Sequence, residues 1–434
     1  FGCQMNEYDS NRILDLTKRI GYEKTNNIEE CNCYIINTCH IREKATDKVY
    51  HDVGRLKKKF KNKKKPILII AGCVAQAEGE IILKKEKFID AVIGPQSYHE
   101  ITKIIKEIEL KNKKLNYTEF DVISKFDHLN LVENTNSKIS TFLTIQEGCD
   151  KFCKFCVVPY TRGPEHSRSF KEIIAEANQL VLNGSKEIIL LGQNVNAYYS
   201  DNKKLSDLIY ELNKIKGLKR IRYTTSHPKD MTDDLIQAYK KCDKLMPLLH
   251  LPVQSGSSKI LDAMNRKHDL YEYLRIIEKL KKTKKNIKFS SDFIIAYPGE
   301  TEGDFKETLN LLEKIKFINT YSFVFSSRPG TPSSNLKIID QKIAKQRLLK
   351  FQDLSSEIKK NYRKNLLNSK IKVLFESETS NKNKYFGRDE YFNSVIVNNS
   401  ENLIGKVKNV MINEFNQTTL FGEVISENKK NVAA

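Results

Sequence analysis

The chain lacks the features of a membrane-spanning or secreted protein. It has no apolar run approaching the ~20 residues that a bilayer-spanning helix needs, and no secretory signal opens it. It also lacks an initiating Met, because it begins at Phe1, and we expect the true N-terminus to be missing. The nine cysteines are an odd number, which fits metal binding in a reducing compartment better than a disulfide framework. We therefore expect a cytoplasmic protein without a membrane anchor.

Acidic residues are the scarcer charged class. The chain has 54 Asp and Glu against 74 Lys and Arg, which gives a formal net charge of +20. Such an excess favours a polyanionic partner such as nucleic acid. An AT-rich genome would also enrich Lys, however, and lysine runs such as 57–59 and 63–65 are equally consistent with solvated surface. Charge alone does not separate these two interpretations.

The most informative motif is a C-x3-C-x2-C run formed by Cys149, Cys153 and Cys156. Three thiolates this close can hold three corners of a [4Fe–4S] cluster. The fourth iron then has no nearby protein ligand, and an open metal position is typical of a catalytic site. Zinc is the alternative, but zinc prefers four ligands, commonly in C-x2-C pairs. The longer gap and the missing fourth ligand count against zinc.

A second cysteine set is predicted from topology. Residues 1–110 alternate short apolar runs with helical patterns, which predicts a parallel βαβ sheet. Cys39 and Cys73 each end a predicted strand, and Cys3 precedes a helix. Ligands bind such sheets at the carboxyl ends of the strands, so these cysteines are expected to converge on a second cluster. Three unrelated buried thiols are the alternative. The predicted strands are 33–39, 67–73 and 91–95.

The central region 138–366 predicts a partial (βα)6 barrel of the TIM type, followed by a connector helix. Catalytic groups of such barrels lie on the loops after the strands, and the C-x3-C-x2-C run follows the first strand. The polar segment 111–137 is predicted to be a linker. The predicted barrel strands are 140–146, 187–192, 220–225, 248–251, 288–296 and 321–325.

The tail 367–430 changes to short alternating runs punctuated by glycine. This pattern predicts a small antiparallel β-barrel of OB-like character. Aromatic residues beside Lys and Arg could stack bases and pair with phosphates, or they could simply fill a small core. The predicted strands are 371–376, 393–398, 403–415 and 418–425.

Taken together, these motifs resemble the radical S-adenosylmethionine (SAM) methylthiotransferase family over nearly the whole chain, and within it the members that act on tRNA. That family has an N-terminal domain with three cluster cysteines, a radical SAM domain and a C-terminal TRAM domain. Ala296 departs from the pattern, since glycine is usual there. The turn that follows is assigned to helix capping by Thr301 and Asp304, not to chemistry. The matching stretches are 2–6, 156–163, 191–198, 225–228, 250–257 and 328–332.

The resemblance implies a reaction and its cofactors. The reaction adds a methylthio group to C2 of N6-isopentenyladenosine at position 37 of tRNA, next to the anticodon. The C2–H bond is not acidic enough for acid–base chemistry at neutral pH, so a radical cofactor is required. Two [4Fe–4S] clusters are implied, with SAM bound at one of them. The implied partners are the tRNA and an electron donor such as flavodoxin or ferredoxin, and we expect a monomer. The implied cluster ligands are Cys3, Cys39 and Cys73 for one cluster, and Cys149, Cys153 and Cys156 for the SAM cluster.

Polar residues at the ends of the predicted strands are candidates for binding SAM or substrate. Hydroxyl and amide groups there could hydrogen-bond ribose or methionine, and an arginine could bind a carboxylate or an RNA phosphate. The alternatives are turn capping for the amides, a structural role for a lone histidine and ion pairing for the arginine. The candidates are Gln193, Asn194, Ser226, His227, Gln254 and Arg162.

Two other functions stay open at this point. One is methylthiolation of another target, either a tRNA carrying threonylcarbamoyladenosine or a ribosomal protein. The other is a non-catalytic iron–sulfur protein that binds RNA or senses redox state. The open cluster position and the polar strand ends favour an enzyme.

Overall fold

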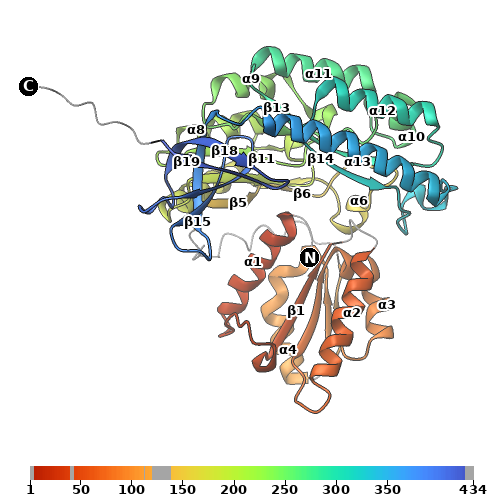
Figure 1. Ribbon diagram of the computed structural model, residues 1–434. Helices are drawn as coiled ribbons and strands as arrows, with labels where there is room; N and C mark the ends of the chain where they lie inside the picture. The colour runs from red at the N-terminus through yellow and green to blue at the C-terminus, as the bar shows by residue number, and fades with distance from the viewer. Residues whose placement is uncertain (1–3, 40–43, 112, 120–137, 426–434) are drawn as a thin grey trace, which may run out of the picture.

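The computed structural model describes residues 4–39, 44–111, 113–119 and 138–425. Three units follow one another along the chain: an N-terminal α/β unit, a central half-barrel of parallel strands and a closed C-terminal β-barrel (Figure 1). Cys3 lies outside the described residues, as does most of the predicted linker. In the part of the chain that the structure describes, no helix combines the length and the apolar composition needed to cross a membrane.

The N-terminal unit is a parallel sheet in the order β1-β2-β3-β4. Its apolar strands are covered on both faces, by α2 and α3 on one side and by α1 and α4 on the other. The last strand occupies residues 115–117 of the predicted linker, and it was missed because three residues leave no apolar run to detect. The elements are α1 (Gln4–Lys18), β1 (Cys33–Thr38), α2 (Lys44–Lys59), β2 (Ile67–Gly72), α3 (Cys73–Lys85), β3 (Ala91–Ile93), α4 (Ile101–Lys111) and β4 (Leu115–Tyr117).

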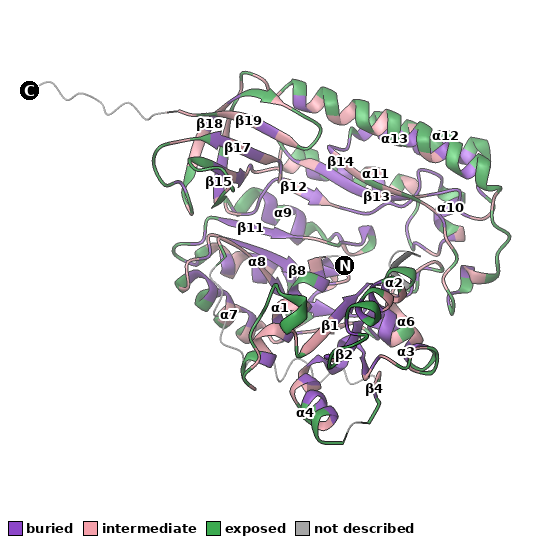
Figure 2. Ribbon diagram, turned by 60° about the horizontal axis from the view of Figure 1, so that its bottom comes forward, coloured by how far each residue is buried: buried purple, intermediate pink, exposed green. Residues whose placement is uncertain are grey.

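The central unit contains all six predicted strands, which confirms the partial (βα)6 architecture. They form two parallel sheets, β11-β8-β5 and β12-β13-β14, which meet at an isolated bridge between Ile221 and Leu245. The buried strands run through the middle of this unit, and α7, α8, α9, α11 and α12 surround them (Figure 2). The strands are β5 (Ser140–Thr144), β8 (Glu187–Leu191), β11 (Arg220–Tyr223), β12 (Leu248–His250), β13 (Lys288–Ile295) and β14 (Asn319–Val324). The helices are α7 (Phe170–Leu182), α8 (Leu205–Lys214), α9 (Asp233–Lys241), α10 (Ser258–Ala263), α11 (Leu270–Thr283), α12 (Glu302–Ile315) and α13 (Gln341–Lys364).

The C-terminal unit is a closed barrel in the order β15-β16-β17-β19-β18. It differs from the expectation in two ways. The strand β16 was not predicted, and β17 pairs with β19 in parallel rather than antiparallel. The aromatic residues Phe375 and Tyr385 point into the small core, which is the commoner of their two expected roles. The strands are β15 (Lys370–Glu378), β16 (Lys384–Arg388), β17 (Ser394–Asn398), β18 (Val407–Phe415) and β19 (Thr419–Val424).

Two arginines of β11 hold the C-terminal barrel against the central unit. Arg220 and Arg222 donate hydrogen bonds of 2.7 to 3.0 Å to the backbone carbonyls of residues 388–390. The Nε of Arg222 also pairs with the buried carboxylate of Glu187 at 2.7 Å. Because both guanidinium groups are buried, these bonds are formed away from water and fix the position of the barrel.

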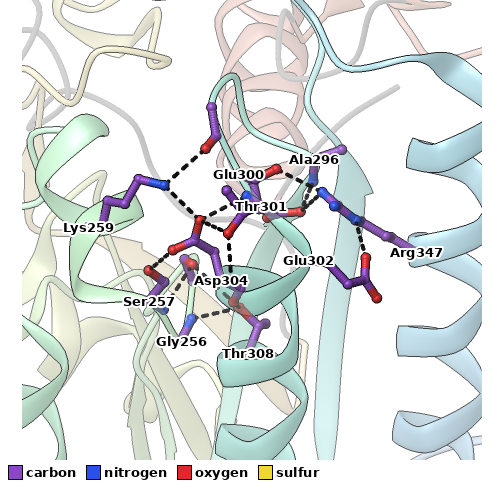
Figure 3. A network of polar contacts seen from close by, with 12 residues as sticks. Gly256, Ser257, Lys259, Ala296, Glu300, Thr301, Glu302, Asp304, Thr308 and Arg347 are labelled. Carbon is purple, nitrogen blue, oxygen red and sulfur yellow. Dashed lines mark hydrogen bonds and ion pairs between the residues drawn. The ribbon is translucent and has the colours of Figure 1, made fainter.

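A polar network fixes the turn between β13 and α12, as the sequence predicts (Figure 3). Thr301 and Asp304 form a reciprocal capping box at the start of α12. The Oε1 of Glu300 accepts from the backbone N–H of Ala296 at 3.0 Å and from Nη1 of Arg347 at 2.9 Å. Arg347 lies on α13, so the same carboxylate secures the connector helix. Ala296 has a φ of +58°, a conformation that glycine adopts without strain.

Candidate functional site

The C-x3-C-x2-C loop begins directly after the short strand β6 (Gln146–Glu147). The chain turns at Gly148 and again at Phe152, with φ values of +74° and +47°. The amide of Cys156 donates to the carbonyl of Cys153 at 2.9 Å, which closes the loop on itself. Desolvation raises the pKa of Cys149 and Cys156 to about 12, and the neighbouring thiols add to the effect. Metal binding at this loop must therefore displace thiol protons.

The donor set of this loop is of the kind that holds an iron–sulfur cluster. It supplies soft sulfur donors from Cys149, Cys153 and Cys156, the residue type that holds iron–sulfur clusters. Among the described residues, no group of three His, Cys, Asp or Glu side chains is placed to hold one metal ion. The zinc interpretation therefore gains no support from the arrangement.

An arginine that the sequence analysis missed contacts the loop. Arg266 follows α10, and its Nη1 lies 3.4 Å from the Sγ of Cys153, while its Nη2 donates to the carbonyl of Pro252 at 2.6 Å. The backbone N–H of Lys154 donates to the carbonyl of Met264 at 3.0 Å. The loop is thus held by a segment more than one hundred residues away. The only sequence signal for the contact between Arg266 and Cys153 is that Arg266 lies four residues before the start of α11.

Gln193 is bound to the cysteine loop. Its Oε1 accepts from the backbone N–H of Gly148 at 2.7 Å. Gln146, also missed from sequence, accepts with its Oε1 from the backbone N–H groups of Gln193 and Asn194, both at 3.0 Å. These bonds join the cysteine loop to the loop after β8. The placement favours a positioning role for Gln193.

Asn194 lies in a charged setting. Its Nδ2 donates to the carboxylates of Glu165 and Asp230 at 3.0 and 2.8 Å. Asp230 in turn pairs at 2.9 Å with Lys151, which lies within the cysteine loop. The Oδ1 of Asn194 is buried and has no hydrogen-bond partner in the protein. A buried, unpaired acceptor of this kind is costly unless a ligand satisfies it.

The backbone is strained at two of the strand ends that were expected to carry ligand-binding residues. Thr225, after β11, has a φ of +67°, and Gln254, after β12, has a φ of +78°. A β-branched residue with positive φ is a genuine outlier, and such strain clusters at functional sites. Ser226 and His227 follow Thr225, and both are buried with a polar atom that has no protein partner. Strand ends with unpaired polar atoms are thus brought together around the cysteine loop.

Arg162 is the centre of a buried ion triad. It is 3% exposed, and it pairs with Glu147 at 2.7 Å and with Asp9 at 2.8 Å. Although burial opposes the charge, Asp9, Cys73 and Glu147 hold its pKa well above the usual value. Asp9 belongs to α1 and Glu147 immediately precedes the cysteine loop, so this ion triad joins the N-terminal and central units.

The second cysteine set borders the same triad. Thr38 and Gly72 are paired in the register of β1 and β2, which places Cys39 and Cys73 at the same edge of the sheet. Gly72 has a φ of +97°, and a side chain there would come within 2.2 Å of the carbonyl oxygen of Thr38. Cys39 and Cys73 are both buried, and Cys73 lies near Arg162. Cys73 therefore lies near the arginine that joins α1 to the residue preceding the cysteine loop, while Cys3 is outside the described residues.

Family models match three parts of the chain. The model of the radical SAM superfamily matches residues 143–312, that of the TRAM domain matches residues 364–425, and one described as uncharacterized protein family UPF0004 matches residues 1–94. Among solved structures, the radical SAM methyltransferase TsrM from Kitasatospora setae is similar, with a TM-score of 0.55 and 11% identity. That match covers 75% of this chain and 74% of TsrM, and it supports the fold alone.

Relatives match the chain along its length. A tRNA-2-methylthio-N(6)-dimethylallyladenosine synthase from Pelagibacter ubique (strain HTCC1062) is 60% identical over 440 residues, covering 100% of this chain and 98% of the relative. A synthase of the same name from Rickettsia typhi (strain ATCC VR-144 / Wilmington) is 45% identical over 438 residues, covering 98% of each. With such identity from end to end, the chain belongs to the tRNA-2-methylthio-N(6)-dimethylallyladenosine synthase (MiaB) family of radical SAM methylthiotransferases.

Proposed function

We propose that the chain adds a methylthio group to C2 of N6-isopentenyladenosine at position 37 of tRNA. The single observation that carries this proposal is the junction of Asp9, Arg162 and Glu147. It joins a unit that carries Cys39 and Cys73 to the loop that carries Cys149, Cys153 and Cys156. A reaction that needs both a radical and a sulfur source requires such neighbouring sites.

This family uses two [4Fe–4S] clusters and SAM, which when bound supply the radical and the methyl and sulfur groups that side chains cannot provide. In this chain, Cys149, Cys153 and Cys156 would hold the SAM cluster. Cys39 and Cys73, with Cys3, would hold the second. The fit rests on the soft donor set of each site and on its burial.

The remaining side chains bind and orient. Arg266 would donate to the sulfur of Cys153 and limit its movement. Asn194 and Ser226, with their unpaired oxygens, would hydrogen-bond the ribose or methionine groups of SAM or the ribose of the substrate. Arg162 and the Oε1 of Gln193 already have protein partners, which supports a positioning role for both residues. Gln254 stays a ligand candidate on its strained backbone.

The partner of the whole molecule is tRNA, and we propose that the basic surface of the C-terminal barrel contributes to binding it. The proposed units keep the boundaries 1–110, 138–366 and 367–430, except that the first extends to include β4. A monomer acting in the cytoplasm, reduced by a flavodoxin or ferredoxin, fits the family assignment.

Mass spectrometry of tRNA nucleosides from cells with and without this gene tests the proposal. Loss of the 2-methylthio form, with accumulation of N6-isopentenyladenosine, is the expected result. Unchanged nucleosides would overturn it, and a lost modification on threonylcarbamoyladenosine or on a ribosomal protein would identify the other targets. Anaerobic incubation of the purified protein with SAM and dithionite separates an enzyme from a redox sensor, since a sensor forms no 5′-deoxyadenosine.

A further inference from the structure

Two buried histidines meet beside the cysteine loop. His227 follows β11 and His268 precedes α11, and their ring centroids are 5.6 Å apart in an edge-to-face arrangement. They are 4% and 7% exposed. His268 also stacks on Tyr273, with centroids 6.0 Å apart. The sequence analysis singled out His227 but had no reason to pair it with a residue about forty positions away.

The hydrogen bonds of the two rings fix different tautomers. The Nδ1 of His227 accepts from the backbone N–H of Lys229 at 3.1 Å, so in the neutral ring the proton is on Nε2. The Nδ1 of His268 lies 3.2 Å from the carbonyl oxygen of Asp269. A carbonyl can only accept, so here Nδ1 carries the proton and Nε2 is an acceptor. Both Nε2 atoms are buried without a protein partner.

The surroundings keep both rings neutral. Burial lowers the pKa of His227 far below its usual value, and Arg266, His268, Lys151 and Lys229 add to the effect. Burial and Arg266 lower the pKa of His268 to about 4, against an opposing contribution from Asp269. The pair therefore presents one N–H donor and one nitrogen acceptor at physiological pH, and no charge.

This pair lies close to the proposed chemistry. Arg266, whose charge acts on both rings, also contacts the Sγ of Cys153 at 3.4 Å. Ser226 is next to His227 in the chain, and its hydroxyl is also buried and unpaired. With the two rings 5.6 Å apart, one planar ligand that reaches both Nε2 atoms would offer an acceptor to His227 and a donor to His268, and it would carry no charge there.

We propose that His227 and His268 bind the edge of an adenine, with His227 donating to a ring nitrogen and His268 accepting from the N6–H group. Adenine presents this pair of an acceptor nitrogen and an N6–H donor on one edge. The inference rests on the proposed function, in which both SAM and the isopentenyl-modified nucleoside carry adenine with an N6–H. The donor–acceptor match supports adenine from either source.

Ligand discrimination by the anaerobically reconstituted holoenzyme tests the proposal. In the SAM arm, the dissociation constant of S-adenosylhomocysteine is compared with that of S-inosylhomocysteine, in which an oxygen acceptor replaces the N6 donor. In the RNA arm, tRNA with N6-methyladenosine at position 37 is compared with the same tRNA carrying N6,N6-dimethyladenosine, which lacks N6–H. The wild-type protein should prefer the N6–H ligand by about tenfold or more in one arm, because a buried acceptor would otherwise be left unpaired.

The variants are chosen so that packing and hydrogen bonding are separated. His268→Phe keeps the stacking on Tyr273 but removes the acceptor. It should bring the ratio of the two dissociation constants close to one in the arm where the wild-type protein discriminates. His268→Gln retains an acceptor and should keep most of the preference. His51→Phe, at an exposed position of α2, is the matched control and should change nothing.

The arm in which the preference collapses identifies the source of the adenine. A preference that survives His268→Phe in both arms, or that is absent from the wild-type protein, would overturn the inference. Methylthio product formed by such a protein would leave the proposed function intact. Conversely, discrimination that depends on His268 in a protein that makes no methylthio product would contradict the function and not the adenine site.

Discussion

At the scale of single residues, buried side chains beside the cysteine loop supply one another with hydrogen bonds and charge. Arg266 illustrates this, because one guanidinium group contacts a cysteine sulfur and a backbone carbonyl and also lowers the pKa of two histidines. Its Nε has no protein partner. Hydrogen bonds to cysteine sulfur and nearby charge are among the factors that set the reduction potential of a cluster.

We predict that Arg266→Gln lowers the reduction potential of the SAM cluster. The arginine donates to Cys153 and carries a positive charge, and both effects stabilise the reduced, more negative cluster. Arg266→Lys should show a smaller shift, because it keeps the charge. Redox titration followed by electron paramagnetic resonance measures the potential, with Arg275→Gln at an exposed position of α11 as the control. An unchanged potential in a variant with full iron content would contradict the prediction.

We predict that the free energy of unfolding falls at acidic pH because of His268. Its pKa is about 4 in the folded protein and 6.5 in the reference state, so the unfolded chain binds the proton more readily between these values. The contribution to stability is complete above pH 6.5 and is lost as the pH falls toward 4, by at most about 1.4 kcal/mol per pH unit. Denaturant titrations at pH 5, 6 and 7 should show a slope to which His268 and His227 both contribute, and it should be smaller in His268→Gln. Equal slopes in the two proteins would show that His268 is not the group responsible.

At the scale of elements, the backbone strain and the candidate ligand-binding residues lie at the ends of the barrel strands. Thr225, Gln254 and Ala296 each follow a barrel strand with positive φ. At Thr225 and Gln254 the strain accompanies candidate ligand residues. At Ala296 it accompanies a capping network that does no chemistry, so relieving it there should be harmless.

Ala296→Gly should therefore stabilise the protein. A non-glycine residue in the left-handed region costs about 1–2 kcal/mol, against a smaller entropic cost of glycine in the unfolded chain. We expect a gain of up to about 1 kcal/mol in the free energy of unfolding, with the rate of SAM cleavage unchanged. Ala263→Gly, inside α10, is the opposite control and should destabilise. A loss of stability in Ala296→Gly would mean that the buried methyl group outweighs the strain.

The local parts of the site could be predicted from the sequence, and the distant parts could not. The cysteine loop is encoded by spacing within nine residues, and the barrel strands appear as apolar runs. Arg266 touches Cys153 across 113 positions, and no local pattern signals such a contact. No local pattern indicates that the Oε1 of Gln193 accepts from Gly148, or that Arg162 pairs with two carboxylates. The sequence shows that a polar residue stands at the end of a strand, but it does not show which group that residue binds.

At the scale of the whole molecule, the two cysteine sets can be separated by mutation. We predict that Cys73→Ala lowers the iron content of the reconstituted protein from about eight to about four atoms per chain. Reductive cleavage of SAM should continue to some degree, while methylthio product should disappear. Cys242→Ala, which removes a buried thiol outside both sets, should keep all of the iron and product. Normal methylthio yield from Cys73→Ala would show that this residue holds no required cluster.

The basic surface of the C-terminal barrel gives the last prediction. Lys372, Lys406 and Lys408 line a groove of about 510 Å³ with Lys219 and Arg220. If phosphates bind there, replacing the three barrel lysines with Gln should weaken tRNA binding and reduce its salt dependence, by about one unit of slope per lost contact. SAM cleavage should be unaffected. Replacing Lys57, Lys58 and Lys59 of α2 makes the same charge change elsewhere, and equal effects from both sets would contradict a specific role for the groove.

The way in which Arg220 and Arg222 hold the barrel has a consequence for sequence divergence. Both guanidinium groups bind carbonyl oxygens of residues 388–390, and every amino acid supplies a carbonyl. The docking therefore depends on the path of that segment, which the buried carboxylate of Asp389 fixes by accepting from the backbone N–H groups of Tyr391 and Asn393. Homologues should be free to vary positions 388 and 390 as long as Asp389 keeps the turn, whereas either arginine could be replaced only if the barrel were redocked. The attachment of the TRAM domain to the radical SAM unit thus rests on two arginines of one unit and a single turn-forming aspartate of the other.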